Sequence, residues 1–499
     1  MARGPHRSRW LLLGLTWLAL ALRMAGLTAQ SLWRDEVDAL IFATRPLSAL
    51  LGMFHQPGQN GPLFFLALRP WLAVAGISEF ALRFPSALAG ALAVPVLYAL
   101  IRRLVGDRRP AAVAALLMTT APYLIWYGQE AKMYAVLTVL APASLLLTFE
   151  VVRRGGWWRW GLLYVITSLC FYTHLLAALI VPVQALWLVL LPSAPSRSVR
   201  RRWLTAGAYL AVLILPYLPL LMWQAPTWLG PTYQTGHPFV PLGDILQVLT
   251  VAFSRGILPL EQPSTLLPYL LAATAGVILW PLEERRRTSG RALSPWRVVA
   301  LLLIWLLVPP LAIYGLSLHL SLFTDRYLIW AMPAFLALVG LGVSALAQTW
   351  RPLGLIALCA ILALNLLSAG AQTTRPIKSD LRSAARYILA HRQGTDLLVY
   401  QIPHIRYTFS YYASGLNDPN DPLLLGMDGL YTNGGMSEAE AADRMARGTA
   451  GARAIWLIAS EASMWDQRGL TEQWLAEHGT PALHADFERV SVTRYELHP

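Results

Sequence analysis

Long apolar stretches, separated by short polar or charged segments, fill the first 370 residues of the chain. A helix that crosses a membrane needs about 20 mainly apolar residues. The first stretch is long and is followed by no clean small-x-small cleavage site, so we expect a retained helix rather than a signal peptide. In all, the pattern predicts eleven spans, near residues 10–28, 82–101, 110–128, 133–150, 158–174, 175–192, 203–223, 264–282, 297–317, 327–347 and 353–370.

Two regions depart from this pattern. Residues 29–81 form a long first outer loop, in which an apolar run broken by Arg69-Pro70 predicts an interfacial or re-entrant helix. Residues 371–499 hold twelve basic and fifteen acidic residues, and helical runs such as SDLRSAARYILAH alternate there with strand-like runs such as DLLVYQI. We therefore expect a polytopic α-helical membrane domain over 1–370 and a soluble, extracytoplasmic α/β domain over 371–499.

The composition agrees with a membrane protein. The 499 residues are 56% hydrophobic and 13% charged, whereas a soluble domain has roughly 25% charged residues. Together with a mean hydropathy of +0.48, this excludes a soluble globular chain and a disordered one. The two cysteines, Cys170 and Cys359, both lie in apolar stretches and indicate no disulfide framework.

The distribution of charge predicts an orientation. The net charge is +13, but the basic residues gather in short clusters between apolar stretches, which is typical of membrane topology rather than of nucleic-acid binding. With the N-terminus inside, the cytoplasmic loops collect twenty basic residues, and the outer side up to residue 370 has eight. We therefore expect a multi-pass protein of the cell membrane, inner or plasma, with a cytoplasmic N-terminus and the C-terminal domain outside. Only two of the forty basic residues are lysines, Lys132 and Lys378, an arginine bias that favours a bacterial source.

The first outer loop opens with a cluster of charges that includes Asp35, Glu36 and Asp38. Adjacent carboxylates repel one another, so one of them can hold its proton to higher pH and serve as a general base. The alternative is a helix N-terminus with an ordinary acidic first turn. The local pattern leaves both interpretations open.

A second cluster, Tyr127 to Tyr134, lies at the outer turn between the third and fourth expected spans and contains Glu130 and Lys132. A charge near the membrane centre costs about 2.5–3.5 kcal/mol, so such residues usually line a cavity or pair with another charge. The alternative for Lys132 is a side chain that reaches to the membrane interface.

Further polar residues fall on the same expected membrane face. Any one of them alone is more often an interface residue, a helix cap or a structural ion pair than a catalytic group. Their shared face makes them candidates for a single site. They are His55, Asn60, Glu79, Arg83, His174, Asp325, Arg326 and Tyr327.

Taken in order, the motifs resemble those of a known family, the GT-C glycosyltransferases of the family-39 type, which include protein O-mannosyltransferases and the aminoarabinose transferases of lipid A. The likeness covers nearly the whole chain, with Gly61 where the family usually has proline and Lys132 where it has arginine. The motifs are W-R-D-E at 33–36, N-G-P-L-F-F at 60–65, S-E-F-A-L-R-F-P-S-A-L at 78–88, Y-G-Q-E-A-K-M-Y at 127–134, Y-T-H at 172–174, D-R-Y at 325–327 and S-D-L-R-S-A-A-R-Y-I at 379–388.

The resemblance implies a GT-C fold with an outward-facing cavity. It also implies transfer of a sugar, with inversion, from a polyprenyl-phosphate donor to an acceptor hydroxyl of a protein, lipid or cell-envelope glycan. Asp35 would be the general base, and Glu36 would orient the acceptor or the sugar. Because the leaving group is a phosphate, cations must meet its growing charge, and the candidates are Lys132, Arg326 and Arg83. The candidates for binding the sugar or the acceptor are Glu130, His55, Tyr134, His174 and Asn60.

Cofactors and alternative functions stay open at this point. One carboxylate and one distant histidine, Glu130 and His174, are a weak signal for a divalent metal ion. The expected partners are the donor lipid, the acceptor and the bilayer, without nucleic acid. A transporter or flippase is disfavoured because the sequence shows no repeated halves with matched broken helices. A scaffold that uses the outer domain to bind cell-wall material is a third interpretation, in which Asp35 would be dispensable.

Overall fold

The structure is a computed structural model that describes residues 5–55, 60–192, 199–230, 235, 237–285, 293–394, 396–416 and 426–498. The chain forms two compact units. The helical unit comprises Met1–Leu27 and Phe42–Gln372, and the α/β unit comprises Thr28–Ile41 and Thr373–Pro499. Residues 28–41, which the sequence analysis placed with the membrane domain, therefore group with the C-terminal part of the chain.

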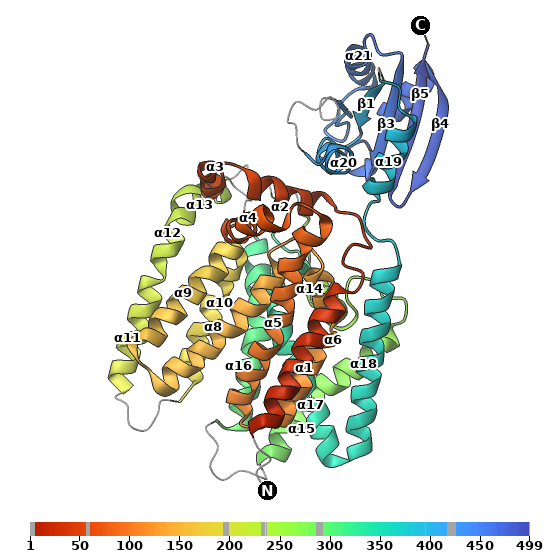
Figure 1. The fold of residues 1–499 in the computed structure, drawn as a ribbon. Helices are drawn as coiled ribbons and strands as arrows, with labels where there is room; N and C mark the ends of the chain where they lie inside the picture. Colours follow the sequence, from red (N-terminus) through yellow and green to blue (C-terminus); the bar gives the residue numbers. More distant parts are fainter. Residues whose placement is uncertain are drawn as a thin grey trace. The chain divides into compact units, whose positions relative to one another are not determined.

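Figure 1 shows the elements in chain order. Helix α2 (Arg34–Thr44) begins in the α/β unit and ends in the helical unit. The other elements up to residue 374 are α1 (Pro5–Met24), α3 (Leu47–Leu51), η1 (Gly52–His55), α4 (Leu63–Ala75), α5 (Glu79–Val105), α6 (Arg108–Thr120), α7 (Pro122–Gly128), α8 (Tyr134–Arg154), α9 (Trp157–Thr173), η2 (Leu175–Leu179), α10 (Ile180–Leu190), α11 (Val199–Val212), α12 (Ile214–Trp223), α13 (Ala225–Trp228), α14 (Leu242–Arg255), η3 (Pro263–Leu266), α15 (Leu267–Arg285), α16 (Pro295–Ser317), η4 (Asp325–Ala331), α17 (Met332–Thr349) and α18 (Arg351–Thr374).

Each of the eleven expected spans coincides with one helix or with two consecutive helices. Among the described residues, six helical segments are long and apolar enough to cross a membrane, and the bent pair α6–α7 makes up to seven. The polytopic helical fold is thus confirmed, while the number eleven stays a prediction. The run that was expected to be interfacial or re-entrant forms α4, whose 13 residues are too few to span about 30 Å of hydrocarbon.

The bend between α6 and α7 is encoded by a proline. Pro122 opens α7, and the residue before it, Ala121, takes an extended ψ of 116°, because the ring of a proline disfavours helical geometry in the preceding residue. The two helices meet at 54°. The fully buried side chain of Arg23 donates hydrogen bonds to the carbonyls of Thr119 (3.4 Å) and Met118 (3.5 Å) at the end of α6, where a cation suits the helix dipole.

Helices α15 and α17 pack closely because glycines face each other where they cross. A Cβ atom on Gly342 would lie 1.7 Å from the carbonyl oxygen of Ala272, and one on Gly276 would lie 2.0 Å from that of Leu338. Small residues at a crossing let helix backbones approach, which is a common way of packing helices in membranes.

The α/β unit contains one five-stranded sheet, with strand order β2-β1-β3-β5-β4. Strands β2, β1 and β3 are parallel, and β5 and β4 continue the sheet antiparallel. This confirms the expected α/β domain. Its elements are α19 (Leu381–His391), β1 (Leu397–Tyr400), α20 (Ile405–Ser414), β2 (Met427–Asp428), α21 (Glu438–Gly448), β3 (Ala454–Ser460), η5 (Ala462–Met464), α22 (Leu470–His478), β4 (Gly479–Phe487) and β5 (Val490–Leu497).

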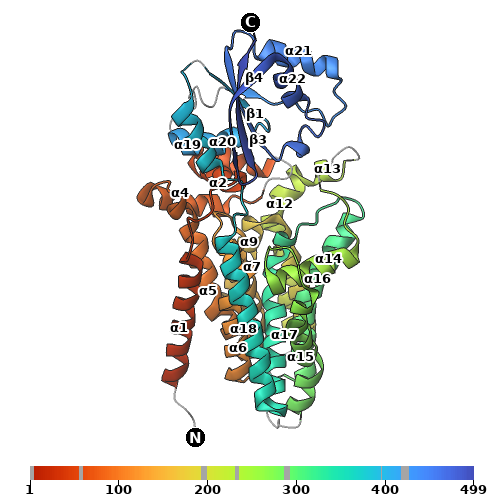
Figure 2. The same cartoon turned by 90° about the vertical axis from the view of Figure 1, so that its right-hand side faces the viewer.

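Helices cover both faces of this sheet (Figure 2). Because alternate side chains of a strand point to opposite faces, β3 contributes to two cores. Trp456 packs with α19 and α20 in one core, and Leu457 packs with α21 and α22 in the other. Strand β3 is thus buried on both sides, which explains its almost continuous apolar sequence AIWLIAS.

We expect Gly342→Ala to destabilise the helical unit, because the added methyl group would collide with the backbone of α15. Such overpacking typically costs about 1–3 kcal/mol. Thermal unfolding of the full chain in detergent measures the effect. Gly315→Ala on α16 is the matched control, since a Cβ atom there meets nothing within 4 Å. Equal unfolding temperatures for the two variants would contradict the tight crossing.

Candidate functional site

The two adjacent carboxylates at the start of α2 lie in different environments. Both belong to the first turn of the helix, as the helix-terminus interpretation expects. The Glu36 side chain is fully buried, accepts a hydrogen bond from the backbone N–H of Trp33 at 3.4 Å and pairs with Lys378 Nζ at 2.8 Å. Asp35 is only half-buried. Of the two carboxylates, Asp35 is therefore the one within reach of solvent.

His404, at the start of α20, lies in the electrostatic field of the same turn. Burial, and after it the positive charge of Arg34, lower the pKa of His404 to about 4, and the negative charge of Asp35 acts in the opposite direction. His404 is therefore neutral at pH 7 and able to donate or accept a hydrogen bond.

In the helical unit, the turn between α7 and α8 carries Glu130 and Lys132. Both side chains are buried, with 2% and 8% of their surface exposed. Two hydrogen bonds tie the turn to other segments: Ser86 Oγ of α5 donates to the carbonyl of Lys132 at 3.0 Å, and Gln129 Nε2 of the turn donates to the carbonyl of Ala25 at 2.7 Å. Within the described parts of the chain, no carboxylate oxygen lies within 4.0 Å of Lys132 Nζ. An ammonium group on a largely buried side chain, without a carboxylate beside it, is suited to an anionic ligand.

His174 interrupts the helical chain between α9 and η2. Its backbone is extended (φ −151°, ψ 128°), and its Nδ1 accepts a hydrogen bond from the N–H of Leu176 at 3.2 Å. An accepting Nδ1 carries no proton, so the neutral ring holds its proton on Nε2. This Nε2 is buried and has no hydrogen-bond partner among the described residues. A buried donor without a partner costs about 1–3 kcal/mol, and a bound ligand oxygen would remove that cost.

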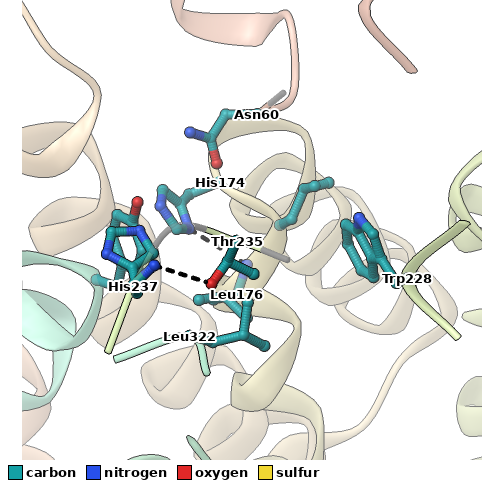
Figure 3. Close-up of a pocket in the computed structure, with 9 residues that line it drawn as sticks. Asn60, His174, Leu176, Trp228, Thr235, His237 and Leu322 are labelled. Atoms are coloured by element: carbon teal, nitrogen blue, oxygen red, sulfur yellow. Dashed lines mark hydrogen bonds between the residues drawn. The ribbon is translucent and has the colours of Figure 1, made fainter. Parts of the chain in front are cut away.

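His174 lines a pocket of about 140 Å³ in the helical unit. Figure 3 shows its ring near Thr235 and His237, with Asn60 and Leu322 on opposite sides of the space. The lining thus combines a few polar groups with apolar surfaces, as in many small-molecule sites. The lining residues are Asn60, His174, Leu175, Leu176, Trp228, Thr235, His237, Leu322 and Tyr327.

An aromatic and cationic cluster adjoins this pocket. The ring of His174 lies 4.7 Å from that of Tyr327 and 6.1 Å from that of Tyr134. The guanidinium of Arg326 lies 5.8 Å from the centre of the Tyr134 ring. Burial, and then the charge of Arg326, lower the pKa of His237, so that His237 is neutral at pH 7. The pocket therefore combines neutral hydrogen-bonding groups with a nearby positive charge.

The surroundings of Gly61 explain why this position, where the resembled family usually has proline, holds a glycine. A Cβ atom at this position would lie 2.1 Å from the carbonyl oxygen of Tyr172, so only glycine allows the loop to lie against the end of α9. The neighbour Asn60 lines the pocket, and Tyr172 is two residues before His174. The close approach thus brings two of the sequence-predicted residues to one place.

The remaining candidates have separate surroundings. Arg83 is buried and donates to the carbonyl of Leu27 at 2.8 Å, which gives it a structural contact at the end of α1. Asp325 accepts a hydrogen bond from the hydroxyl of Tyr123 at 2.9 Å. The side chain of His55 lies outside the described part of the structure. Sequence reasoning missed Trp228, Thr235 and His237 in the pocket and the role of Lys378.

The described residues offer little support for a bound metal ion. They contain no group of three or more histidine, cysteine, aspartate or glutamate side chains placed to hold an ion. Glu130 and His174 supply at most two protein ligands, whereas catalytic zinc sites usually have three. A site built on this pair stays a hypothesis without support from geometry.

The helical unit and the α/β unit together define a multi-pass membrane protein with the GT-C fold, the fold that the sequence motifs implied. Residues 56–223 match the family model described as dolichyl-phosphate-mannose-protein mannosyltransferase. This segment includes Asn60, Lys132 and His174 but not Asp35. A comparison with curated protein sequences finds no match.

Two solved structures are similar over most of this chain. ArnT from Cupriavidus metallidurans, in a crystal structure with undecaprenyl phosphate, is 15% identical, with a TM-score of 0.59 and 98% of each chain covered. The AglB oligosaccharyltransferase of Archaeoglobus fulgidus, in complex with an inhibitory peptide and a dolichol-phosphate, is 12% identical, with a TM-score of 0.56, 98% of this chain and 74% of that one covered. At such identities the likeness establishes the fold and leaves the reaction to be argued from the residues.

We expect the α/β unit to lose stability in acid through His404. Its pKa in the folded chain is about 4, below the ordinary value of about 6.5, so between these pH values the unfolded chain binds a proton that the folded chain does not. The stabilising contribution is complete above pH 6.5 and declines as the pH falls toward 4, by at most about 1.4 kcal/mol per pH unit. Thermal unfolding between pH 7 and 4.5 should show a shallower decline for His404→Gln than for the wild type. His391→Gln, at an exposed position of α19, is the control, and identical profiles for His404→Gln and wild type would refute the assignment.

Proposed function

We propose that the chain is an inverting glycosyltransferase that moves a sugar from a polyprenyl-phosphate donor to an acceptor hydroxyl on the outer face of the cell membrane. The observation that carries this proposal is the buried Lys132, which lacks a carboxylate within 4.0 Å among the described residues and adds to the positive field at His174. The fold supports it, because solved structures of the same fold contain undecaprenyl phosphate or dolichol-phosphate. No feature of the described residues favours the transporter alternative.

The proposed reaction is a single displacement. The acceptor oxygen bonds to the anomeric carbon as the bond from this carbon to the phosphate oxygen breaks, and the lipid phosphate leaves with the electron pair. Asp35, the solvent-accessible carboxylate of the first α2 turn, takes the proton of the acceptor hydroxyl. Lys132 and Arg326 meet the charge that develops on the phosphate. Asp35 belongs to the α/β unit, whereas Lys132 and Arg326 belong to the helical unit.

The pocket is proposed to hold the sugar. Its volume of about 140 Å³ suits a single small ring, and the Nε2–H of His174 is a donor for one ring hydroxyl. Trp228 and Tyr327 offer the aromatic surfaces on which sugar rings commonly rest, and Asn60 adds hydrogen-bonding capacity. Glu130, Tyr134 and His55 stay candidates for further contacts to the sugar or the acceptor.

The general-base role predicts the effect of one isosteric change. Asp35→Asn should lower sugar transfer by about 100-fold or more, because the amide cannot accept the acceptor proton. The assay uses membranes that contain the wild type or the variant, with a panel of radiolabelled polyprenyl-phosphate sugars. Asp38→Asn, one turn further along α2 and paired with Arg34 at 3.7 Å, is the matched control and should retain most of the activity. Equal activity in wild type and Asp35→Asn would exclude this carboxylate as the base.

The role of Lys132 predicts opposite effects on binding and on stability. Lys132→Met should weaken binding of undecaprenyl phosphate by about 10-fold or more, since a hydrogen bond to a charged group contributes about 1.5–3 kcal/mol. The same change should leave the unfolding temperature unchanged or raise it, because it removes a buried charge that has no carboxylate partner. Lys132→Arg should keep the affinity. Lower stability of Lys132→Met with unchanged lipid affinity would show that the ammonium group serves the fold.

A further inference from the structure

Residues 28–32, which precede α2, are bound by the C-terminal part of the chain through a set of hydrogen bonds. They join residues that are about 345 to 380 positions apart in the sequence. The contacts are Gln30 Nε2 to the Arg375 carbonyl (2.6 Å), Ser31 Oγ to the Ser379 carbonyl (2.6 Å), the Leu32 N–H to the Tyr412 hydroxyl (2.5 Å), the Ile377 N–H to Gln30 Oε1 (3.0 Å) and Arg382 Nη2 to the carbonyls of Thr28 (3.0 Å) and Gln30 (3.1 Å).

The first turn of α2 is held by an ion pair in the same unit. Lys378 Nζ lies 2.8 Å from Glu36 Oε2, and the two side chains are 6% and 0% exposed. The ammonium group also lies 5.9 Å from the centre of the Trp33 ring. A carboxylate without access to water needs a partner, because an uncompensated buried charge is strongly destabilising. Lys378 supplies it, and Asp35 is the residue directly before Glu36 in the same helical turn.

This contact lies at a particular edge of the sheet. Ser460, the last residue of β3, donates from its hydroxyl to that of Ser379 at 3.2 Å. Helix α20, which carries Tyr412, follows β1, the parallel neighbour of β3. The carboxyl ends of parallel strands are where open α/β sheets usually bind their ligands. In this chain, residues 28–36 of its own first outer loop pack at that edge.

We propose that Lys378 is a positioning residue for Asp35, and that the α/β unit serves to hold the proposed catalytic turn at the carboxyl edge of its sheet. The inference rests on the proposed function of Asp35. Glu36 is the link, since its carboxylate is joined to Lys378 and its backbone is continuous with Asp35. The geometry of a general base is sensitive, and a displacement of about 1 Å can cost 100-fold in rate.

The test compares two buried ion pairs of the α/β unit. Lys378→Met breaks the pair with Glu36. Arg494→Met breaks the pair between Arg494 Nε and Asp396 Oδ2. These atoms lie 2.9 Å apart, and the two side chains are 7% and 1% exposed. Neither side chain forms a hydrogen bond with the described residues 28–41. Both variants should lower the unfolding temperature. We expect only Lys378→Met to lower kcat, by about 10-fold or more at saturating donor, with little change in the KM for the donor.

A conservative variant distinguishes a role of Lys378 in positioning Asp35 from a general effect on stability. Lys378→Arg restores a cation and should recover most of the kcat that Lys378→Met loses. Equal kcat values for Lys378→Met and Arg494→Met, per folded molecule, would overturn the proposal. If Lys378→Met does not fold, the double variant Glu36→Gln/Lys378→Met leaves no unpaired charge in the core and takes its place in the exchange measurement below.

Hydrogen exchange provides a readout that does not depend on sugar transfer. The N–H groups of Leu32 and Glu36 are bonded in the folded chain and should exchange slowly in the wild type. We expect Lys378→Met to speed exchange in residues 28–38 and Arg494→Met to leave it unchanged. If the wild type transfers no sugar from any donor, the proposed function fails. Faster exchange in Lys378→Met would still show that Lys378 holds the first turn of α2 in place. Unchanged exchange in Lys378→Met would refute the positioning role of Lys378, whether or not the chain is a transferase.

Discussion

The carboxylate of Glu36 has no access to water, and this constraint links the two segments that make up the α/β unit. A buried carboxylate must be neutralised by a cation that the chain itself supplies, and here the cation comes from Lys378, which is 342 residues away. To bring these two side chains together, the C-terminal part of the chain has to fold against residues 28–41. The hydrogen bonds of residues 28–32 join the same two segments of the chain, and Ser460 at the end of β3 bonds Ser379 next to Lys378.

Of the buried polar groups described in the helical unit, some are bonded to backbone carbonyls and others are not. The terminal nitrogens of Arg23 and Arg83 donate to backbone carbonyls near helix ends, although Arg23 Nε has no partner among the described residues. Lys132 and the Nε2 of His174 lie at interruptions between helices and lack such partners among the described residues. Groups of the first kind stabilise the unit, whereas groups of the second kind leave binding capacity for a ligand. This difference is consistent with the roles proposed above for Lys132 and His174.

The fold class could be predicted from the sequence, and two of the candidate residues, Asn60 and His174, line the pocket, but the partners of the polar residues could not be predicted. Apolar length predicts spanning helices, and alternating helical and strand-like runs predict the C-terminal sheet, because these signals are local. The pairing of Glu36 with Lys378 has no local signal beyond the rarity of lysine in the chain. Trp228, Thr235 and His237 come from a segment without a strong pattern, and only the packing of distant helices brings them to His174.

The division of the α/β unit between the two ends of the sequence has a consequence for biosynthesis. Residues 28–41 emerge from the ribosome early, whereas the residues that bind them begin at 373. At about 5–20 residues per second, a separation of 342 residues corresponds to a delay on the order of 20–70 s. During this interval a nascent chain carries its acidic loop without the partners that bury Glu36. Residues from 373 onward therefore complete a segment that was made much earlier, and a ribosome that stops short of residue 378 leaves Glu36 without Lys378.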